Sequence, residues 1–195
     1  MIHAKAEIQR SRFTDLGQLP IAVRIGSYNA QTLFWGFCEP KWWRNFLYTH
    51  SFFEVCYAYS GRGIFRMMGR EYAVKAGDLF VAKPGEPHEI VSEHRKPLGI
   101  YFWAYTLIRG KSTGGDSSAI DALLEAFLRS PRWVNRARGM WQTLELLTEE
   151  VVRRLPGLPI AIDGLVTKLM LDTARAVVEE PISAEQLAPP AASAS

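Results

Sequence analysis

The chain is poor in cysteine, with only Cys38 and Cys56 among its 195 residues. Two cysteines are too few for the disulfide framework of a small secreted protein. Both lie in apolar, strand-like stretches, so we expect reduced thiols in the core of a cytoplasmic protein. The N-terminal sequence MIHAKAEIQRSR also lacks the apolar segment of a secretory signal.

Long apolar runs and a strong excess of one charge are missing too. No uninterrupted apolar stretch approaches the roughly 20 residues needed to cross a bilayer, so we expect no contact with a membrane. The formal net charge is only +3, and lysine and arginine are scattered along the chain. A nucleic-acid-binding domain usually presents a basic stripe or patch, so the charge alone does not indicate DNA binding. Hydrophobic residues make up 48% of the chain, which is enough for a full core.

Glycine and proline divide the first half of the chain into short pieces rich in β-branched and aromatic residues. Turns such as Ser60-Gly61-Arg62-Gly63 permit positive φ and join antiparallel neighbours. The pattern predicts strands at about 21–27, 31–38, 51–59, 62–68, 70–75, 78–82, 87–93 and 98–106. Short antiparallel strands with no helices between them predict a jelly-roll sandwich or barrel.

The character of the sequence changes near residue 110, after which apolar residues recur at helical spacing. The spacing predicts helices at roughly 117–129, 134–155 and 160–179. A Leu-Pro-Gly-Leu-Pro turn at 155–159 joins the last two helices, which should therefore lie antiparallel. The predicted fold class is mainly β with an α appendage: a jelly-roll β-barrel followed by an antiparallel helical hairpin.

This pattern divides the chain into four segments. We expect an N-terminal arm at 1–20, a barrel at 21–108 and a helical region at 117–179. The tail at 181–195 begins like a capped helix and then turns to proline and small residues, so we expect its last residues to be disordered. The helices either cap the barrel or present an apolar stripe to a second subunit, and we expect a homodimer through 134–155 and 160–179.

Two histidines and a glutamate stand among the glycines and prolines of the barrel region. The pattern consists of His50, Glu54, Gly61, Gly77, Pro84-Gly85 and His88. It resembles the two motifs of the cupin superfamily, H-x-H with a later E and G, then G, P-G and H. The resemblance places His50, Glu54 and His88 at three ligand positions of a metal cupin, whereas Tyr48 stands at the position of the remaining histidine.

Two roles are open for these residues. Three ligands and an open position suit Zn²⁺ or Fe²⁺. A straight strand would separate residues four apart by roughly 13 Å, so a shared site needs a bend between Ser51 and Phe53. In the other role, Glu54 and His88 line the pocket as hydrogen-bonding groups and His50 lies at its rim, because a buried carboxylate needs only donors. We expect the second role and no cofactor.

A narrower resemblance covers roughly residues 20 to 188. The sequences K-A-G-D-L at 75–79 and K-P-G-E-P-H at 83–88, with the aromatic strand at 100–105, resemble the sensor domain of AraC-type transcription regulators. The resemblance implies a cupin-like barrel for a small-molecule effector and two helices for dimerisation. The first residues of the tail, 181–188, also resemble the start of the family's DNA-binding domain, so 181–195 is either the start of that missing domain or a disordered tail. The helix-turn-helix units that normally follow are not evident, so we expect this chain to reach DNA only through a domain that it lacks.

The resemblance also suggests where the effector binds. Trp103 matches an aromatic residue that stacks on sugar in sugar-sensing relatives, and an indole face suits a sugar C–H face or a cation. Tyr101 shares its strand face by alternation, and Trp35 and Phe37 lie on a strand that could form the opposite wall. The predicted ligand-binding residues for a sugar or aromatic effector are Trp103, Tyr101, Glu54, His88, Trp35 and Phe37. Packing in the core is the alternative for each aromatic residue.

Two functions follow from these patterns. The first is an effector-sensing, dimerising domain of a transcription regulator, which is not an enzyme. The second is a metal-dependent cupin enzyme, such as a dioxygenase or isomerase, with His50, Glu54 and His88 as metal ligands and an open position for substrate.

Overall fold

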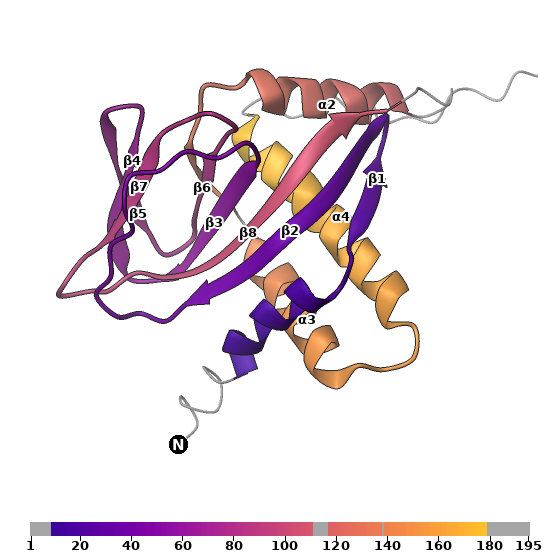
Figure 1. Ribbon diagram of the computed structural model, residues 1–195, viewed down its shortest axis with the longest axis horizontal. Coiled ribbons are helices and arrows are strands. Elements are labelled where there is room, and N and C mark those ends of the chain that lie inside the picture. Colours follow the sequence, from indigo (N-terminus) through magenta and orange to yellow (C-terminus); the bar gives the residue numbers. More distant parts are fainter. Residues whose placement is uncertain (1–8, 111–116, 138, 179–195) are drawn as a thin grey trace, which may run out of the picture.

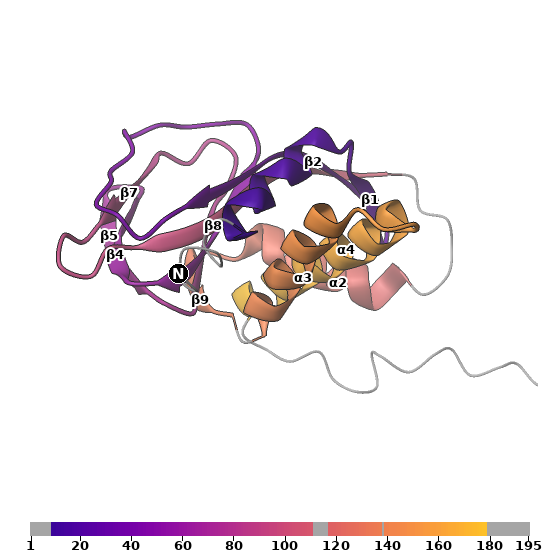
Figure 2. The ribbon, with the colours of Figure 1, turned by 90° about the horizontal axis from the view of Figure 1, so that it is seen from below.

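The computed structural model describes residues 9–110, 117–137 and 139–178. Two antiparallel sheets face each other at one end of the molecule, and helices cover the outer face of the larger sheet (Figures 1 and 2). The predicted fold class, mainly β with a helical appendage, is confirmed.

The larger sheet has six strands and the smaller sheet has three. In spatial order the larger sheet consists of β1 (Ala22–Ile25), β2 (Tyr28–Cys38), β8 (Gly99–Arg109), β3 (Phe53–Ser60), β6 (Asp78–Ala82) and β9 (Val134–Arg136). The smaller sheet consists of β5 (Arg70–Lys75), β4 (Arg62–Met67) and β7 (His88–Ser92). The tight turns that bound β4 place Gly61 and Gly69 at positive φ, which explains glycine at both positions. The predicted strands therefore all form, with ends within a few residues of those expected.

Strand alternation gives the larger sheet two buried faces with different partners. Cys56 pairs across to Phe102 and both face the smaller sheet, whereas Val55 pairs to Trp103 and both face the helices. A register shift in β2 between Thr32 and Phe34 exchanges the two faces of that strand. The barrel interior is thus separate from the hydrophobic core beneath the helices.

The helical layer consists of α2 (Ser117–Arg129), α3 (Met140–Arg153), α4 (Leu158–Val177) and the 3-10 helix η1 (Arg12–Gln18). The helix α4 follows α3 through Gly157, which adopts the left-handed conformation, and the two helices pack closely. They form the predicted hairpin. None of the described helices combines the length and apolarity needed to cross a membrane.

Two expectations need correction. Residues 134–136 form the edge strand β9 instead of helix, because Val134 pairs with Phe80 and the Arg136 guanidinium binds Asp78 at 2.8 Å. The helix α3 begins only after Gly139. The expected arm is docked where it is described, since Phe13 and Leu16 of η1 are fully buried. The remaining arm residues, 1–8, and the tail at 181–195 lie outside the described residues.

Candidate functional site: a histidine–glutamate cluster in the barrel

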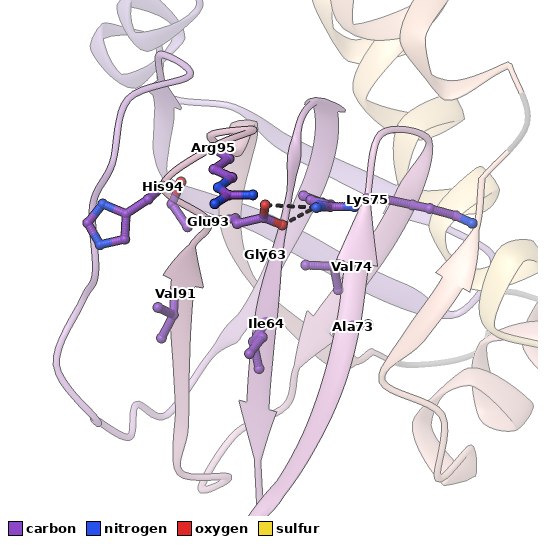
Figure 3. A pocket seen from close by; sticks show the side chains of 11 residues that line it. Gly63, Ile64, Ala73, Val74, Lys75, Val91, Glu93, His94 and Arg95 are labelled. Carbon is purple, nitrogen blue, oxygen red and sulfur yellow. Dashed lines mark hydrogen bonds and ion pairs between the residues drawn. The ribbon is translucent and has the colours of Figure 1, made fainter.

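A surface groove of about 670 Å³ lies on the outer face of the smaller sheet (Figure 3). Its floor is apolar, with Ile64, Ala73 and Val91 on adjacent strands, and the ion pair between Arg62 and Glu93 lies at its rim. The groove brings together no group of histidine, cysteine and carboxylate ligands. Among the described residues, the group of histidine and carboxylate side chains lies instead inside the barrel.

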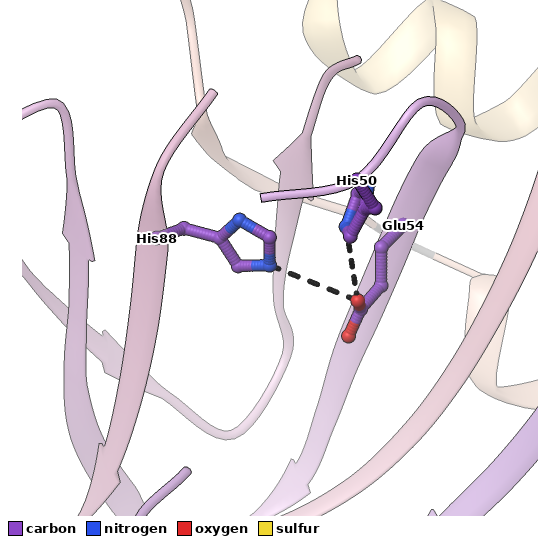
Figure 4. Close-up of side chains that lie close together, drawn as sticks. All are labelled: His50, Glu54 and His88. Atoms are coloured by element: carbon purple, nitrogen blue, oxygen red, sulfur yellow. Dashed lines mark ion pairs between the residues drawn. The ribbon is translucent and has the colours of Figure 1, made fainter. Parts of the chain in front are cut away.

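Inside the barrel, His50, Glu54 and His88 converge (Figure 4). Glu54 Oε2 lies 3.2 Å from His50 Nε2 and 3.7 Å from His88 Nε2. One ligand atom from each residue lies within 4.8 Å of the others. The three side chains are almost inaccessible to solvent, with exposed fractions of 6%, 7% and 1% respectively.

A bend in the chain makes this convergence possible. The strand β3 begins only at Phe53, and the two residues before it form the bend that a shared site requires. The ring of Phe52 stacks on His50 with 4.0 Å between the ring centres. The backbone N–H of Gly85 donates to the His50 carbonyl at 2.8 Å, which holds the bend against the turn before β7. His88 is the first residue of β7 and so reaches the same end of the barrel.

Tyr48 completes the polar group. Its hydroxyl donates to Glu54 Oε2 at 2.8 Å, and its ring centre lies 4.4 Å from that of His88. Burial raises the pKa of Tyr48 well above its ordinary value, and the charge of Glu54 adds to this effect. The tyrosine at the position of the missing motif histidine is therefore a protonated donor to the glutamate.

The charges in the cluster follow from this geometry. Burial works to raise the pKa of Glu54, but the adjacent His88 and the hydrogen bond from Tyr48 outweigh it, so the pKa is lowered. Burial lowers the pKa of His50, and the proximity of His88 contributes. At neutral pH the cluster therefore contains an ionised carboxylate beside a neutral imidazole.

Several ring nitrogens in the cluster have no hydrogen-bond partner. Both ring nitrogens of His50 and the Nε2 of His88 are buried and unsatisfied. His88 Nδ1 lies 3.0 Å from the carbonyl oxygen of Glu86, an acceptor that requires the proton on Nδ1. His88 Nε2 is then the ring nitrogen that faces Glu54. Two imidazoles and a carboxylate in this arrangement fit a divalent metal ion such as Zn²⁺ or Fe²⁺.

The structure separates the predicted ligand-binding residues into two groups. Glu54 and His88 lie in the barrel, as described above. The aromatic residues Trp103, Tyr101, Trp35 and Phe37 lie on the opposite face of the larger sheet, against the helices. The prediction that one pocket contains all six is wrong, because the sheet itself lies between the two groups.

Phe13 of η1 fills the centre of the aromatic group. Its ring lies edge-on to Trp35, with 5.3 Å between ring centres, and edge-on to Tyr101 at 4.8 Å. Trp103 and Tyr101 are fully buried in this packing. The alternation that places Tyr101 and Trp103 on one face is confirmed, and only the identity of that face differs from the expectation.

Sequence reasoning missed two contributors near the site. Cys56 Sγ lies 3.9 Å from Glu54 Oε1, whereas His88 lies near the other oxygen, Oε2. Lys83, at the end of β6, is 9% exposed and donates to backbone carbonyls of the helical layer. The alternation from Glu54 indicates that Cys56 shares its face, but no sequence signal identifies the acceptors of Lys83.

Known proteins are similar to this chain over part of its length. The family model of the AraC-like ligand binding domain matches residues 41–151. The uncharacterized HTH-type transcriptional regulator YfiF of Bacillus subtilis (strain 168) is 30% identical over 80 residues, which are 41% of this chain and 24% of that protein. The chain therefore spans about a quarter of the length of this curated relative.

Solved cupin structures are also similar to part of the chain. An RmlC-like cupin from Shewanella frigidimarina is 20% identical with a TM-score of 0.31, and the match covers 45% of this chain and 86% of that one. A predicted oxalate decarboxylase from Thermotoga maritima is 21% identical with a TM-score of 0.33, and covers 46% of this chain and 91% of that one.

Proposed function

The chain belongs to the family of AraC-like ligand-binding domains, and on this premise we propose that it senses a small-molecule effector for a transcriptional regulator. The similarity to YfiF, which is described as an HTH-type transcriptional regulator, supports the proposal. In this role the barrel binds the effector, and a separate helix-turn-helix region of the regulator contacts DNA.

The observation on which the proposal depends is the enclosed cluster of Tyr48, His50, Glu54 and His88. It presents an ionised carboxylate and unsatisfied imidazole nitrogens in an otherwise apolar barrel. Such a site favours binding of a ligand that supplies several hydrogen-bond donors, because each buried polar atom left unpaired costs about 1–3 kcal/mol. The hydroxyl groups of a sugar, or an aromatic compound with polar substituents, meet this requirement.

The aromatic group under the helices has a different role in this proposal. The strand β3 carries Glu54 on one face and Val55 on the other, where it pairs with Trp103. A ligand that moves β3 would therefore shift the packing of the sheet on the helices. Direct contact of Trp103, Tyr101, Trp35 or Phe37 with an effector would require Phe13 to leave its position between Trp35 and Tyr101.

We also propose that the protein dimerises through its last two helices. Leu146 and Val152 of α3 are 49% and 41% exposed, and Ile160 of α4 is 81% exposed. Apolar side chains of this size favour burial against a partner. Sedimentation equilibrium tests the proposal: Leu146→Glu with Ile160→Glu should give a monomer where the wild type is a dimer, and a monomeric wild type would contradict it.

A thermal-shift screen of sugars, aromatic acids and amines tests the sensing function. A ligand that binds only the folded protein raises the melting temperature. Glu54→Gln should abolish the shift of a genuine hit, whereas Glu71→Gln, on the exposed outer face of the smaller sheet, should leave it unchanged. A hit whose shift is identical in both variants would place its binding site outside the cluster.

A bound metal ion is the second candidate, favoured by the unsatisfied nitrogens of His50 and His88. His50, Glu54 and His88 would hold the ion, which would supply a Lewis acid to polarise an oxygen of the effector or of a substrate. Tyr48 would fix the orientation of Glu54 through its hydrogen bond. Such an ion serves a metal-dependent sensor or a cupin enzyme equally.

Elemental analysis of protein purified without a histidine tag tests this candidate. A metal site would show as stoichiometric Zn or Fe in the wild type and as its loss in His88→Ala. Protein that contains no metal and binds none on addition of Zn²⁺ would remove this candidate and leave the hydrogen-bonding role of the cluster. Turnover of a substrate that depends on the same ion would favour the enzyme over the sensor.

A further inference from the structure

Lys83 is a buried cation that joins the barrel to the helical layer. Its Nζ donates to the carbonyl oxygens of Phe127 at 3.0 Å and Leu128 at 3.1 Å, and also to that of Ser130. The helix α2 ends at Arg129, and its last carbonyls lack the N–H groups of a following turn, although the Ser130 N–H lies 3.3 Å from the Phe127 carbonyl. A cation at this end completes their hydrogen bonding and opposes the negative end of the helix dipole.

The turn that begins with Lys83 also contacts the cluster at two points. Gly85 donates its N–H to the carbonyl of His50 at 2.8 Å, and the carbonyl of Glu86 fixes His88 Nδ1 at 3.0 Å. Glu86 Oε2 accepts from the Lys83 N–H at 3.1 Å and from the indole of Trp133 at 2.9 Å. The turn is therefore a small, internally bonded unit between the cluster and the end of α2.

The same region reaches the end of α4. Ser130, whose carbonyl accepts from Lys83, places its hydroxyl 3.4 Å from the carbonyl of Val177, the last residue of α4. The helices α2 and α4 also pack on each other. A displacement at residues 83–88 is thus connected by direct contacts to the last turn of α4.

We propose that Lys83 is a positioning residue that couples the His50–Glu54–His88 cluster to the carboxyl ends of α2 and α4. A change in the cluster shifts the 83–88 turn, and Lys83 transfers that shift to the carbonyls at Phe127–Ser130. The identity of what occupies the cluster rests on the proposed function, but the coupling itself is a property of the chain alone. A purely structural lysine would stabilise α2 without responding to the cluster.

The first test needs no ligand and uses hydrogen exchange measured by mass spectrometry on the full chain. The experiment compares four proteins: wild type, His88→Ala, Lys83→Met and the double variant. Lys75→Met, on the exposed edge of β5, is the matched control. We expect His88→Ala to speed exchange at 126–130 by at least about threefold, as residues within one network commonly interact. The same substitution should have no further effect when Lys83 is already methionine, and its full effect in Lys75→Met.

The outcomes are separable. An equal effect of His88→Ala with and without Lys83, or no effect at 126–130, would overturn the coupling. Unchanged exchange in β4 confirms that the variants keep the barrel. Should Lys83→Met not fold, Lys83→Gln replaces it in the same cycle, because its shorter, uncharged side chain weakens the contact with the carbonyls.

The second test adds Zn²⁺ as the probe. Slower exchange at 83–88 should extend to 126–130 and 174–178 in wild type, but should stop at the turn in Lys83→Met. Protection that reaches both helix ends in Lys83→Met would overturn the proposal. If Zn²⁺ protects no segment, the metal candidate fails, and the ligand-free cycle alone decides the coupling.

Discussion

Tyr48 donates its hydroxyl to the same carboxylate oxygen of Glu54 that faces the two histidines. This oxygen, Oε2, lies 2.8 Å from the Tyr48 hydroxyl, 3.2 Å from His50 Nε2 and 3.7 Å from His88 Nε2. A single atom is therefore the centre of the cluster. The other oxygen, Oε1, faces the thiol of Cys56 at 3.9 Å, a weak partner at best.

Tyr48→Phe tests the importance of that central atom. Removal of the hydroxyl takes away one of the groups that lower the pKa of Glu54, so the pKa should rise. A carboxyl group whose pKa is lower in the folded than in the unfolded state stabilises the fold at pH values above its unfolded pKa, here 4.5. The variant loses part of this stabilisation and should be less stable at pH 7. We expect a loss of about 1–3 kcal/mol in urea unfolding, typical of a lost hydrogen bond to a buried charge.

The pH dependence of this loss distinguishes it from a packing defect. As the pH falls through the folded pKa of Glu54, the carboxyl protonates in both proteins and the difference between them should shrink. Tyr59→Phe, which removes a hydroxyl that lies 3.4 Å from the carbonyl of Cys38, is the control. A difference that stays constant as the pH falls from 7 to below the folded pKa of Glu54 would show that the hydroxyl does not act through Glu54.

Phe13→Ala tests the docking of η1 in the aromatic group. Phe13 is fully buried between Trp35 and Tyr101, and deletion of such a ring typically costs about 3–5 kcal/mol. The variant should also bring Trp35 into contact with solvent and shift its fluorescence to longer wavelength. Phe46→Ala is the control, because Phe46 is 90% exposed and its loss should change stability by less than about 0.5 kcal/mol. An unchanged stability of Phe13→Ala would mean that η1 is detached in solution.

The strand positions could be predicted from the sequence because glycine marks the turns between them. Gly61, Gly69 and Gly77 all adopt positive φ, the conformation that selects glycine and ends a strand. The edge strand β9 could not be predicted, since a three-residue strand within an apolar helical pattern has no local signal. Its partner Asp78 lies 58 residues earlier in the sequence than Arg136.

The faces of β8 show a different limit. Alternation correctly groups Tyr101 with Trp103, but both faces of this strand are buried along most of its length. A strand with one face in solvent reveals its inner face through polar residues, whereas β8 offers no such contrast. The sequence could predict only that His50 and Glu54 would converge if the chain bends before Phe53. The structure contains that bend.

Gly36→Ala tests how tightly the barrel interior is packed. A Cβ at Gly36 would lie only 1.9 Å from the ring of Phe102, its partner on β8. The ring must therefore move further into the barrel, and overpacking of this kind typically costs about 1–3 kcal/mol. Gly17→Ala is the control, because a Cβ there meets no atom within 4 Å. A Gly36→Ala protein as stable as wild type in urea unfolding would show that the interior has room for the displaced ring.

Tyr105→Phe tests the burial of the sheet beneath the helices through alkaline titration. Burial raises the pKa of Tyr105 above its ordinary value of 10.0, and the side chain is 2% exposed. A raised folded pKa means that the contribution to stability is complete below pH 10.0 and is lost as the pH rises, because the unfolded chain then ionises first. Between pH 10 and 11 the free energy of unfolding of wild type should fall by about 1 kcal/mol more than that of Tyr105→Phe, close to the limit of 1.36 kcal/mol per pH unit for one proton.

The free energy of unfolding in urea at both pH values measures this slope, with Tyr72→Phe on the smaller sheet as the control. Equal slopes in wild type and Tyr105→Phe would mean that the hydroxyl of Tyr105 reaches water, and hence that the helices do not seal this face of the sheet.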